Sequence, residues 1–473
     1  MTQTLEDTRI LPPRWRDLVA PDLLSYSIIL AGGVVLHAMN VFISATIMPS
    51  VVQEIGGVAY YAWATSLFVM FSIVSAALTA RLHNWLGPQK AYLFAFGVFC
   101  AGTIICGLSS NIGVFNAGRA VQGAGGGFLY ALAYIVIRAV FPERLWPLAI
   151  GLITLMWGVA TLTGPAIGGI FAELGAWRSA FYALLPIALV LSILCVLVLP
   201  GRTDQEHRNS AVPWVQLILL VAIVAVVSVG STVTGKLSTG TTLALAAFLL
   251  VVLYRVEKTA TGRLLPSGAL CSKSNLGFHY LFLAFMMLGM QPEAFVPYFL
   301  QVLQGLSPLV AGYMGALMAF GWTLASAQSA KFTGKRADNT LVHGAVWSFS
   351  GLAIQALLLP TPMNSWLGIG VLAVGLVLVG YGIGFCWPHL TTKIFKTAEP
   401  ADQDTAAAAV TTVQLFATAL GASLAGMIAN AGGMTDPGGQ AGASSAAFWL
   451  FLVFLLAPAA ALLFARRALL PAN

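Results

Sequence analysis

Charged side chains are scarce in this chain of 473 residues. Asp, Glu, Lys and Arg together make up 8% of the sequence, whereas soluble domains carry roughly 25%. Hydrophobic residues make up 59%, and the mean hydropathy is +0.87. This composition excludes a soluble globular protein of ordinary kind, because most of the chain must face lipid or other apolar helices.

Other absences narrow the class of function. The five cysteines show no paired spacing, so we expect neither a disulfide framework nor a metal site. The chain has no cysteine–histidine cluster, no HExxH motif and no nucleophile motif, which argues against an enzyme and against a bound cofactor. The net charge is +7, but the basic residues do not cluster on a soluble face, so no nucleic acid partner is expected.

The start of the chain carries no recognisable cleavable signal peptide. Its first 27 residues are polar and interrupted by prolines. We predict a cytoplasmic N-terminal tail over residues 1–27. Within it, Trp15–Leu24 is either a short helix lying in the membrane interface or part of a disordered segment.

Fourteen apolar stretches are long enough to cross a membrane, for which a helix needs about 20 residues. The stretch at 240–254 is the weakest of them because it is short. The runs are too long and too uniformly apolar for barrel strands, so the prediction is an all-α integral membrane protein. The stretches are 28–49, 62–80, 91–109, 113–137, 147–172, 179–199, 214–233, 240–254, 277–302, 309–330, 341–360, 366–388, 405–430 and 446–465.

The lysines and arginines indicate how these spans are oriented. With a cytoplasmic N-terminus, 20 of the 23 fall in cytoplasmic segments, Arg178 and Lys236 fall on the opposite side, and Arg119 lies within a span. The positive-inside rule then predicts that both termini are cytoplasmic and that the number of spans is even. Twelve spans remain compatible with this distribution if the two stretches between 214 and 254 do not cross. We expect the protein in a bacterial cytoplasmic (inner) membrane.

The densest group of motifs lies between Gly118 and Pro186. It contains GRAVQGAGGG, then GVATLTGPAIGG, then GAWRSAFYALLP. Glycines at helical spacing allow two helix backbones to touch, and an arginine inside a span is costly and therefore usually functional. The run GAGGG does not indicate a nucleotide-binding loop, because no strand precedes it.

Taken in order along the chain, these motifs resemble those of the major facilitator superfamily of transporters. TIMP closes the first span, and TARLHNWLGPQKAYLF is similar to the loop that carries the superfamily's G-x-L-x-D-R-x-G-R-R signature. In the second half, PYFLQVLQGLSPLVAG resembles the connection that follows the first helix of that half in the fourteen-span drug:proton antiporter branch. The resemblance implies two six-helix bundles, at 28–199 and 277–473. It also implies a linker at 200–276 that holds two extra transmembrane helices, fourteen in all.

Two positions depart from the family's pattern. Asn84 stands where the loop signature has an acid that helps to latch the cytoplasmic gate, and Asn40 stands where many fourteen-span relatives have an aspartate. The latch would then depend on Arg81, Lys90 or uncharged hydrogen bonds around the turn at Gly87. A second gating or packing seam is predicted in the fifth span at Gly158, Gly164, Pro165, Gly168 and Gly169.

Arg119 is the first of four residues predicted to take part in proton coupling. It lies about six residues inside the outer end of the fourth span, roughly 9 Å deep at the rise of a helix. Its permanent charge would favour proton loss from a nearby carboxylate, a role that the resemblance also implies. The alternative is an arginine that extends to the outer surface.

The other three are Glu293, Glu173 and His37. Glu293 lies between two prolines, where a broken helix would free carbonyl groups to line a cavity, and it either carries a proton or reaches the outer water. Glu173 lies at the outer interface and either pairs with Arg119 or Arg178 or is solvated. His37 is either a protonation site or a neutral interhelical histidine.

The predicted function follows from the family resemblance and from the scarcity of buried acids. We expect a proton-coupled exporter of small, largely lipophilic compounds that works by alternating access. Uptake of a metabolite, and a sensor or lipid-handling protein without coupled transport, are the alternatives. The expected partners are a small-molecule substrate, protons and membrane lipids, and we expect a monomer. Candidate substrate-binding residues are Asn40, Gln122, Tyr130, Trp157, Gln291, Tyr298, Gln301 and Trp387.

Overall fold

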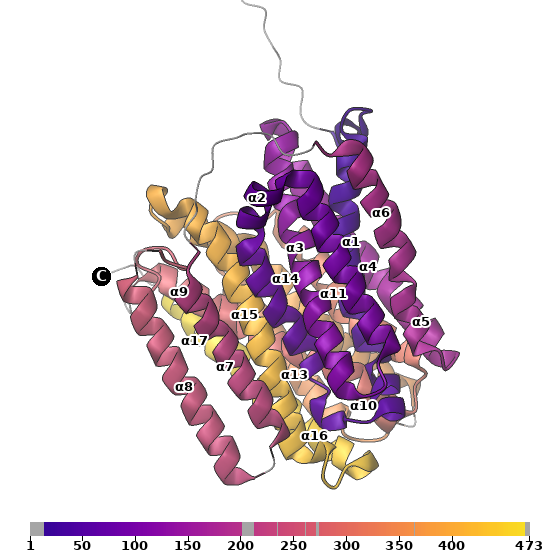
Figure 1. The fold of residues 1–473 in the computed structure, drawn as a ribbon. Helices are drawn as coiled ribbons and strands as arrows, with labels where there is room; N and C mark the ends of the chain where they lie inside the picture. The colour runs from indigo at the N-terminus through magenta and orange to yellow at the C-terminus, as the bar shows by residue number, and fades with distance from the viewer. Residues whose placement is uncertain are drawn as a thin grey trace, which may run out of the picture.

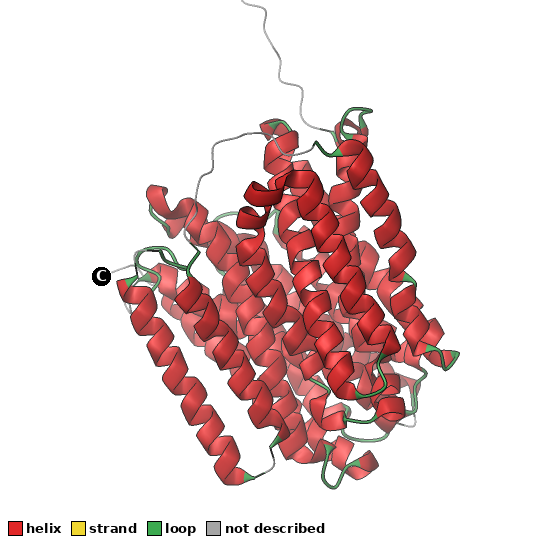
Figure 2. Ribbon diagram, viewed as in Figure 1, coloured by secondary structure: helices red, strands yellow, loops and turns green. Residues whose placement is uncertain are grey.

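The computed structural model describes residues 14–200, 212–233, 235–260, 262–270, 274–363 and 365–468. Within these ranges every regular element is a helix and there is no strand (Figures 1 and 2). The first thirteen residues of the predicted tail, and residues 201–211 of the predicted linker, lie outside the described ranges. Trp15–Val19 forms one short 3₁₀ helix, which is held to α1 where the Ser27 hydroxyl donates to the Leu18 carbonyl.

The helices follow the apolar stretches closely, because a backbone in lipid must satisfy its own hydrogen bonds. The first part of the chain forms α1 (Leu24–Ile55), α2 (Trp63–Leu108), α3 (Ile112–Val140), α4 (Trp146–Glu173), α5 (Trp177–Tyr182) and α6 (Leu184–Val198). The middle forms α7 (Trp214–Thr232) and α8 (Lys236–Thr259). The last part forms α9 (Asn275–Met290), η4 (Gln291–Phe295), α10 (Val296–Gln304), α11 (Pro308–Ser329), α12 (Lys335–Asp338), α13 (Thr340–Leu358), α14 (Trp366–Thr397), α15 (Gln403–Ala429), η6 (Asn430–Met434), α16 (Gly439–Phe454) and α17 (Leu456–Ala468).

Twelve helices in the described ranges are long and apolar enough to cross a membrane. One of them is the stretch around 240–254, which extends to a candidate span over Leu237–Thr259. The predicted spans 62–80 and 91–109 lie in the single helix α2, which leaves helical geometry at Gly87. The predicted span at 277–302 is divided into α9, η4 and α10. The predicted count of fourteen therefore differs from the twelve helices that meet these criteria.

Small residues set the packing in the first part of the chain. α2 and α3 lie against each other along most of their length. Gly123 and Gly125 of α3 face the backbones of Phe68 and Phe99 in α2, where any side chain larger than hydrogen would collide. α1 packs on α4, α3 and α6. This close approach of backbones is what glycine makes available in a membrane, where dispersion contacts replace the hydrophobic effect between helices.

The last part of the chain is organised around α14, which packs on α11 and α13. α9 lies against α17 and α15. α7 contacts α15 and α2, while α8 contacts mainly α7 and lies at the edge of the molecule (Figure 1). The two middle helices are therefore added to the outside of the remaining bundle, α8 being the most exposed of the candidate spans.

Hydrogen bonds between the first and last parts of the chain gather at one end of the molecule in the described residues. The Tyr61 hydroxyl donates to the Ala294 carbonyl, and the Asn430 side chain donates to the Ala59 carbonyl. On the other side of the bundle, the Tyr313 hydroxyl donates to Leu162. All three contacts lie toward the ends of α1, α2, α4 and α15 that the positive-inside rule places outside.

Candidate transport site

Arg119 is held in the interior of the first part of the chain, in the third turn of α3. The helix begins where the Asn111 side chain accepts a hydrogen bond from Val114 N, which caps its first turn. Only 1% of Arg119 is exposed. Arg119 thus lies inside the protein, as predicted, and its side chain does not extend to the outer surface.

Three acceptors on three helices surround the guanidinium. Its Nε donates to the Ala64 carbonyl of α2 at 3.1 Å, and its Nη1 donates to Asn40 Oδ1 at 2.9 Å and to Gln122 Oε1 at 2.6 Å. Its Cζ lies 4.4 Å from the centre of the Phe68 ring. Hydrogen bonds to an ionised group are the strong ones, and an aromatic face adds a favourable cation–π contact.

No carboxylate within the described ranges forms an ion pair with Arg119. The contact that a carboxylate oxygen could make is made by the amide oxygen of Asn40. The charge is therefore balanced by dipoles only, although a buried charge is normally paired with an opposite one. Asn40 and Gln122, which are predicted to bind substrate, both accept hydrogen bonds from Arg119.

His37, Tyr130 and Trp157 come together beside this site. The His37 ring stacks on Tyr130 with 5.5 Å between centroids and lies edge-on to Trp157 at 6.0 Å. Gly126 of α3 faces the His37 ring and has no room for a side chain without displacing it. The structure thus joins one residue predicted for protonation and two predicted for substrate binding into one aromatic cluster, built from α1, α3 and α4.

Glu293 lies in the break between α9 and α10, as its flanking prolines predict. Its carboxylate is partly buried, and no hydrogen bond or ion pair to it is found among the described residues. The Tyr61 hydroxyl donates to the next carbonyl, that of Ala294, at 3.2 Å, and its ring stacks on Phe295 at 4.9 Å. Tyr61 precedes by three residues the Ala64 carbonyl that accepts from Arg119.

Glu173 is placed at a helix terminus and not beside an arginine. Its Oε1 accepts a hydrogen bond at 3.3 Å from Leu309 N, in the first turn of α11, where an acid also suits the helix dipole. Arg178 pairs with Glu54 at 2.5 Å, and Trp177 donates to the same carboxylate. The predicted alternatives of pairing with Arg119 or Arg178 are thus not what the structure shows.

The other predicted substrate residues do not form one site. Tyr298 and Gln301 line a cavity of about 790 Å³ that also includes Glu173. The Gln291 amide donates to the Met287 carbonyl of the preceding helix, α9. Trp387 lies against Trp322 with 5.1 Å between ring centroids. Spacing in the sequence predicts which side chains share a helix face, but it does not predict which helices meet.

The glycine motif of α4 packs against two different partners. A Cβ at Gly164 or Gly168 would meet α1, at Phe42 and Thr46 respectively. A Cβ at Gly169 would lie 2.5 Å from Leu309 Cα in α11. Gly158 has nothing within 4 Å of an added Cβ, so the seam does not extend to it. Pro165 lies inside α4, as predicted.

The loop motif of α2 depends on one glycine and one side chain that the sequence does not single out. Gly87 is buried and has φ = 76°, a left-handed conformation that breaks the helix before Pro88. The next residue but one, Gln89, donates to the carbonyls of Val196 and Leu199 at the end of α6. Arg81 and Lys90 are exposed, and Asn84 is exposed with a bonding partner of its own.

The left-handed backbone of Gly87 gives a stability prediction. Gly87→Ala should lower the free energy of unfolding by about 1–2 kcal/mol, because a Cβ at positive φ approaches the following carbonyl. Gly97→Ala, in the same helix, is the matched control, since an added Cβ there meets nothing within 4 Å and alanine favours helix. Thermal unfolding in detergent compares them. An equal melting temperature for the two variants would contradict the prediction.

Three side chains of the site were not predicted from the sequence. Phe68 supplies the aromatic face for Arg119. Thr103 accepts a hydrogen bond from the Gln122 amide at 2.9 Å and so orients its oxygen toward the arginine. Asn116 is buried one turn before Arg119, and neither polar atom of its side chain has a partner in the described part of the chain. The only indication of Asn116 in the sequence is its position three residues before Arg119, which places both residues on the same face of a helix.

Comparison with known proteins agrees with this architecture. The family model described as Major Facilitator Superfamily matches residues 30–422. A probable multidrug-efflux transporter of Mycobacterium tuberculosis is 35% identical over 466 residues, covering 97% of this chain and 96% of that protein. Multidrug resistance protein 3 of Bacillus subtilis is 24% identical over 84% of this chain and 77% of its own length.

Solved structures show the same fold at low sequence identity. The nucleoside transporter NupG superposes with a TM-score of 0.66 at 12% identity, over 94% of this chain and all of that chain. A D-xylose-proton symporter superposes with a TM-score of 0.62 at 13% identity, over 93% of this chain and 97% of that chain. The fold and the family match define an integral membrane transporter. The chain belongs to the Major Facilitator Superfamily.

Proposed function

We propose that this protein exports small, largely lipophilic compounds in exchange for protons, by alternating access. The observation that carries the proposal is the pair formed by Arg119 and Glu293. Among the described residues, Arg119 is a buried cation that pairs with no carboxylate, and Glu293 is a partly buried acid with no hydrogen-bond or ion-pair partner. The residues at and just before the start of α2 contact both regions. A group that gains and loses a proton inside a membrane protein is costly to keep, and such groups mark ion pathways.

The start of α2 offers a physical link between the two groups. Ala64 accepts from Arg119, and Tyr61, one turn earlier, is bonded to the turn that carries Glu293. A change in the charge of Glu293 would favour a different position of η4. A shift of η4 would move Tyr61, because the Tyr61 hydroxyl is bonded to the Ala294 carbonyl. Because Tyr61 lies in the turn that leads directly into α2 and Ala64 lies in the first turn of that helix, movement at one contact reaches the other without a long pathway.

The direction of transport is supported by the relatives and by the positions of the contacts between the two parts of the chain. Two relatives are named for multidrug efflux or resistance. The contacts between the parts gather at the end that the positive-inside rule places outside. We propose that this end is closed and that the cytoplasmic end opens to receive substrate. The scarcity of buried acids favours neutral or weakly basic compounds, since a buried cation is normally paired with a carboxylate.

We also propose that the chain crosses the membrane fourteen times, with both termini in the cytoplasm. α2 has 46 residues, roughly 69 Å at the rise of a helix, whereas the hydrocarbon core is about 30 Å thick. Two crossings joined at the break at Gly87 fit this length. The 16 residues of α9 are short for a span, but α9, η4 and α10 together are long enough for one. Residues 28–199 and 277–473 would then form the two six-helix bundles.

The test of coupling is Glu293→Gln in proteoliposomes. With a pH gradient imposed and Hoechst 33342 as the transported probe, the variant should lose gradient-driven flux by at least about tenfold, which corresponds to about 1.4 kcal/mol. Exchange of the probe in the absence of a gradient should persist, because glutamine preserves shape and removes only the titratable group. Glu143→Gln, at an acid between α3 and α4, is the control and should transport like the unmodified protein.

Two results would contradict the proposal. Gradient-driven flux that is unchanged in Glu293→Gln, with an unchanged pH dependence, would show that this carboxylate does not carry the coupled proton. Equal accumulation of the probe in cells with and without the protein, for every compound of a lipophilic panel, would contradict export itself.

A further inference from the structure

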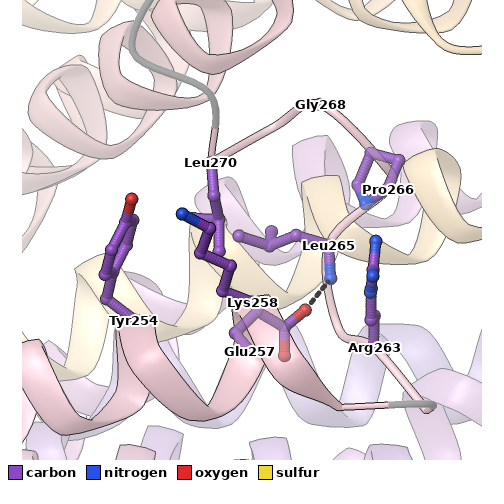
Figure 3. Close-up of a pocket in the computed structure, with 8 residues that line it drawn as sticks. All are labelled: Tyr254, Glu257, Lys258, Arg263, Leu265, Pro266, Gly268 and Leu270. Atoms are coloured by element: carbon purple, nitrogen blue, oxygen red, sulfur yellow. Dashed lines mark hydrogen bonds between the residues drawn. The ribbon is translucent and has the colours of Figure 1, made fainter.

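A pocket of about 420 Å³ lies where α8 ends and the chain turns toward α9 (Figure 3). It is formed by the last turns of α8 and by the segment 262–270, and it is separate from Arg119 and Glu293. Its polar lining comes from Tyr254, Lys258 and Arg263, and its apolar lining from Leu265, Pro266 and Leu270. Such a mixture of cations and apolar side chains suits a ligand that is itself amphipathic.

Neither cation of this pocket forms an ion pair within the described residues, although Arg263 lies near enough to the Asp402 carboxylate to lower its pKa. No hydrogen bond or ion pair of Lys258 is found within the described residues. Arg263 donates from Nε to the Ala260 carbonyl. In Figure 3 the two side chains rise on either side of Leu265, Lys258 on the side of Tyr254 and Arg263 on the side of Pro266. Both residues are exposed, so their charged ends are available to a ligand.

The acid that lines the pocket, Glu257, already accepts hydrogen bonds from the protein. Glu257 is 4% exposed. One of its oxygens accepts from Leu265 N at 2.6 Å (Figure 3). The other accepts from the Gln216 side chain at 3.3 Å. The Gln216 amide also donates to the Gly262 carbonyl. Glu257 therefore serves to fix the turn that carries Arg263 and Leu265.

The position of the pocket relative to the bilayer follows from α8. This helix is a candidate span over Leu237–Thr259, and little of it is buried. Phe248, Val251 and Tyr254 leave exposed apolar surface on the turns that lead to the pocket. A span that ends at Thr259 places Lys258 and Arg263 at the level of the lipid headgroups, with acyl chains beside α8.

We propose that this pocket binds the headgroup of an anionic phospholipid, with its phosphate between Lys258 and Arg263 and its acyl chains along α8. A phosphate has the acceptor oxygens that lysine and arginine require, and Arg263 can contact two of them at once. The Tyr254 hydroxyl lies at the same level, where tyrosine favours the interface. The apolar lining of Leu265, Pro266 and Leu270 favours a lipid over free phosphate, which has nothing to place there.

The same segment is tied to α15, which packs against both α2 and α9. Ser267 donates from its backbone N at 2.7 Å and from its hydroxyl to the Asp402 carboxylate, just before α15 begins. These donors hold the pKa of Asp402 below its usual range. A lipid that fixes the segment would thus also fix the start of α15, so the pocket is placed to link lipid composition to helix movement.

The experiment measures retained lipid on the full-length protein by native mass spectrometry. The purified protein is incubated with mixed micelles that contain equal amounts of phosphatidylglycerol and phosphatidylcholine. The unmodified protein should retain phosphatidylglycerol preferentially, and Lys258→Gln with Arg263→Gln should abolish the preference. About 1 kcal/mol per cation near a headgroup corresponds to about fivefold per residue and about 30-fold for the pair.

Matched variants keep the result interpretable. Lys258→Arg with Arg263→Lys retains both charges and should retain the preference. Arg255→Gln, on α8 but not in the lining, removes an equal charge and should leave the preference intact. The proposal is overturned if the double glutamine variant binds phosphatidylglycerol as the unmodified protein does. It is also overturned if Arg255→Gln has an equal effect, or if inorganic phosphate at millimolar concentration displaces the lipid.

Discussion

Replacing Arg119 by methionine should abolish proton-coupled flux. The guanidinium organises Ala64 of α2, Asn40 of α1 and Gln122 of α3 around one charge. Its loss leaves three buried acceptors without their donor. A hydrogen bond to a charged group contributes about 1.5–3 kcal/mol, so the loss of even one corresponds to about ten- to a hundredfold in flux.

The fold should tolerate this change better than the function does. Removing a buried charge also removes the cost of its desolvation, which offsets part of the lost bonding. We therefore expect a small shift in melting temperature alongside the large loss of gradient-driven flux. Arg119→Lys retains the charge but not the planar arrangement of donors, so its gradient-driven flux should lie between that of the unmodified protein and that of Arg119→Met.

Proteoliposomes with an imposed pH gradient, and a pH-sensitive dye enclosed inside, measure flux of the probe and of protons together. Arg178→Lys is the control, because Arg178 lies at an exposed end and pairs with Glu54. If Arg119→Met retained coupled flux while Arg178→Lys behaved normally, the central role of Arg119 would be refuted.

Gly169→Leu should prevent the outer end from closing. A Cβ at Gly169 would lie 2.5 Å from Leu309 Cα and 2.9 Å from its Cβ. The obstruction is the backbone of α11, which cannot move aside by changing a rotamer. Overpacking of this kind costs about 1–3 kcal/mol, enough to shift a two-state equilibrium by about five- to 150-fold toward the state in which α4 and α11 are apart.

The same helix supplies the control for this prediction. Gly158→Leu adds an identical side chain to α4 at a position where a Cβ meets nothing within 4 Å. Spin labels at Leu174 and Ser307, measured by pulsed electron resonance in proteoliposomes, should report a larger distance in Gly169→Leu than in Gly158→Leu. Flux should fall with the first variant and persist with the second. Equal distances in both would show that Gly169 does not limit closure.

Several features of the site were accessible from the sequence because they are local. The position of Arg119 within a span followed from its place in an apolar run, and the structure places its side chain in the interior. The break at Glu293 followed from Pro292 and Pro297. The turn at Gly87 followed from the Gly-Pro pair. Each of these depends on residues within one or two helical turns, so the chemistry of neighbouring residues is sufficient.

Partners across helices were not accessible in the same way. Glu173 was predicted either to pair with an arginine or to be solvated, and its contact with the first turn of α11, 136 residues away, was not predicted. The hydrogen bond from Arg119 to Asn40 was not predicted either. Periodicity indicates the face of a helix on which a residue lies, while the neighbour of that face is set by the packing of the whole bundle.

The sequence by itself determined the class of protein, the helical content and the family, because lipid requires apolar helices and because the motifs are local strings. The tertiary structure alone decided three points. The charge of Arg119 is balanced by amide and carbonyl dipoles. Gly169 allows α4 to pack closely against α11. The turn after α8 holds two cations beside an acid that is already hydrogen-bonded. Each depends on which helices touch, and that depends on the close fit of glycine-lined surfaces far apart in the chain.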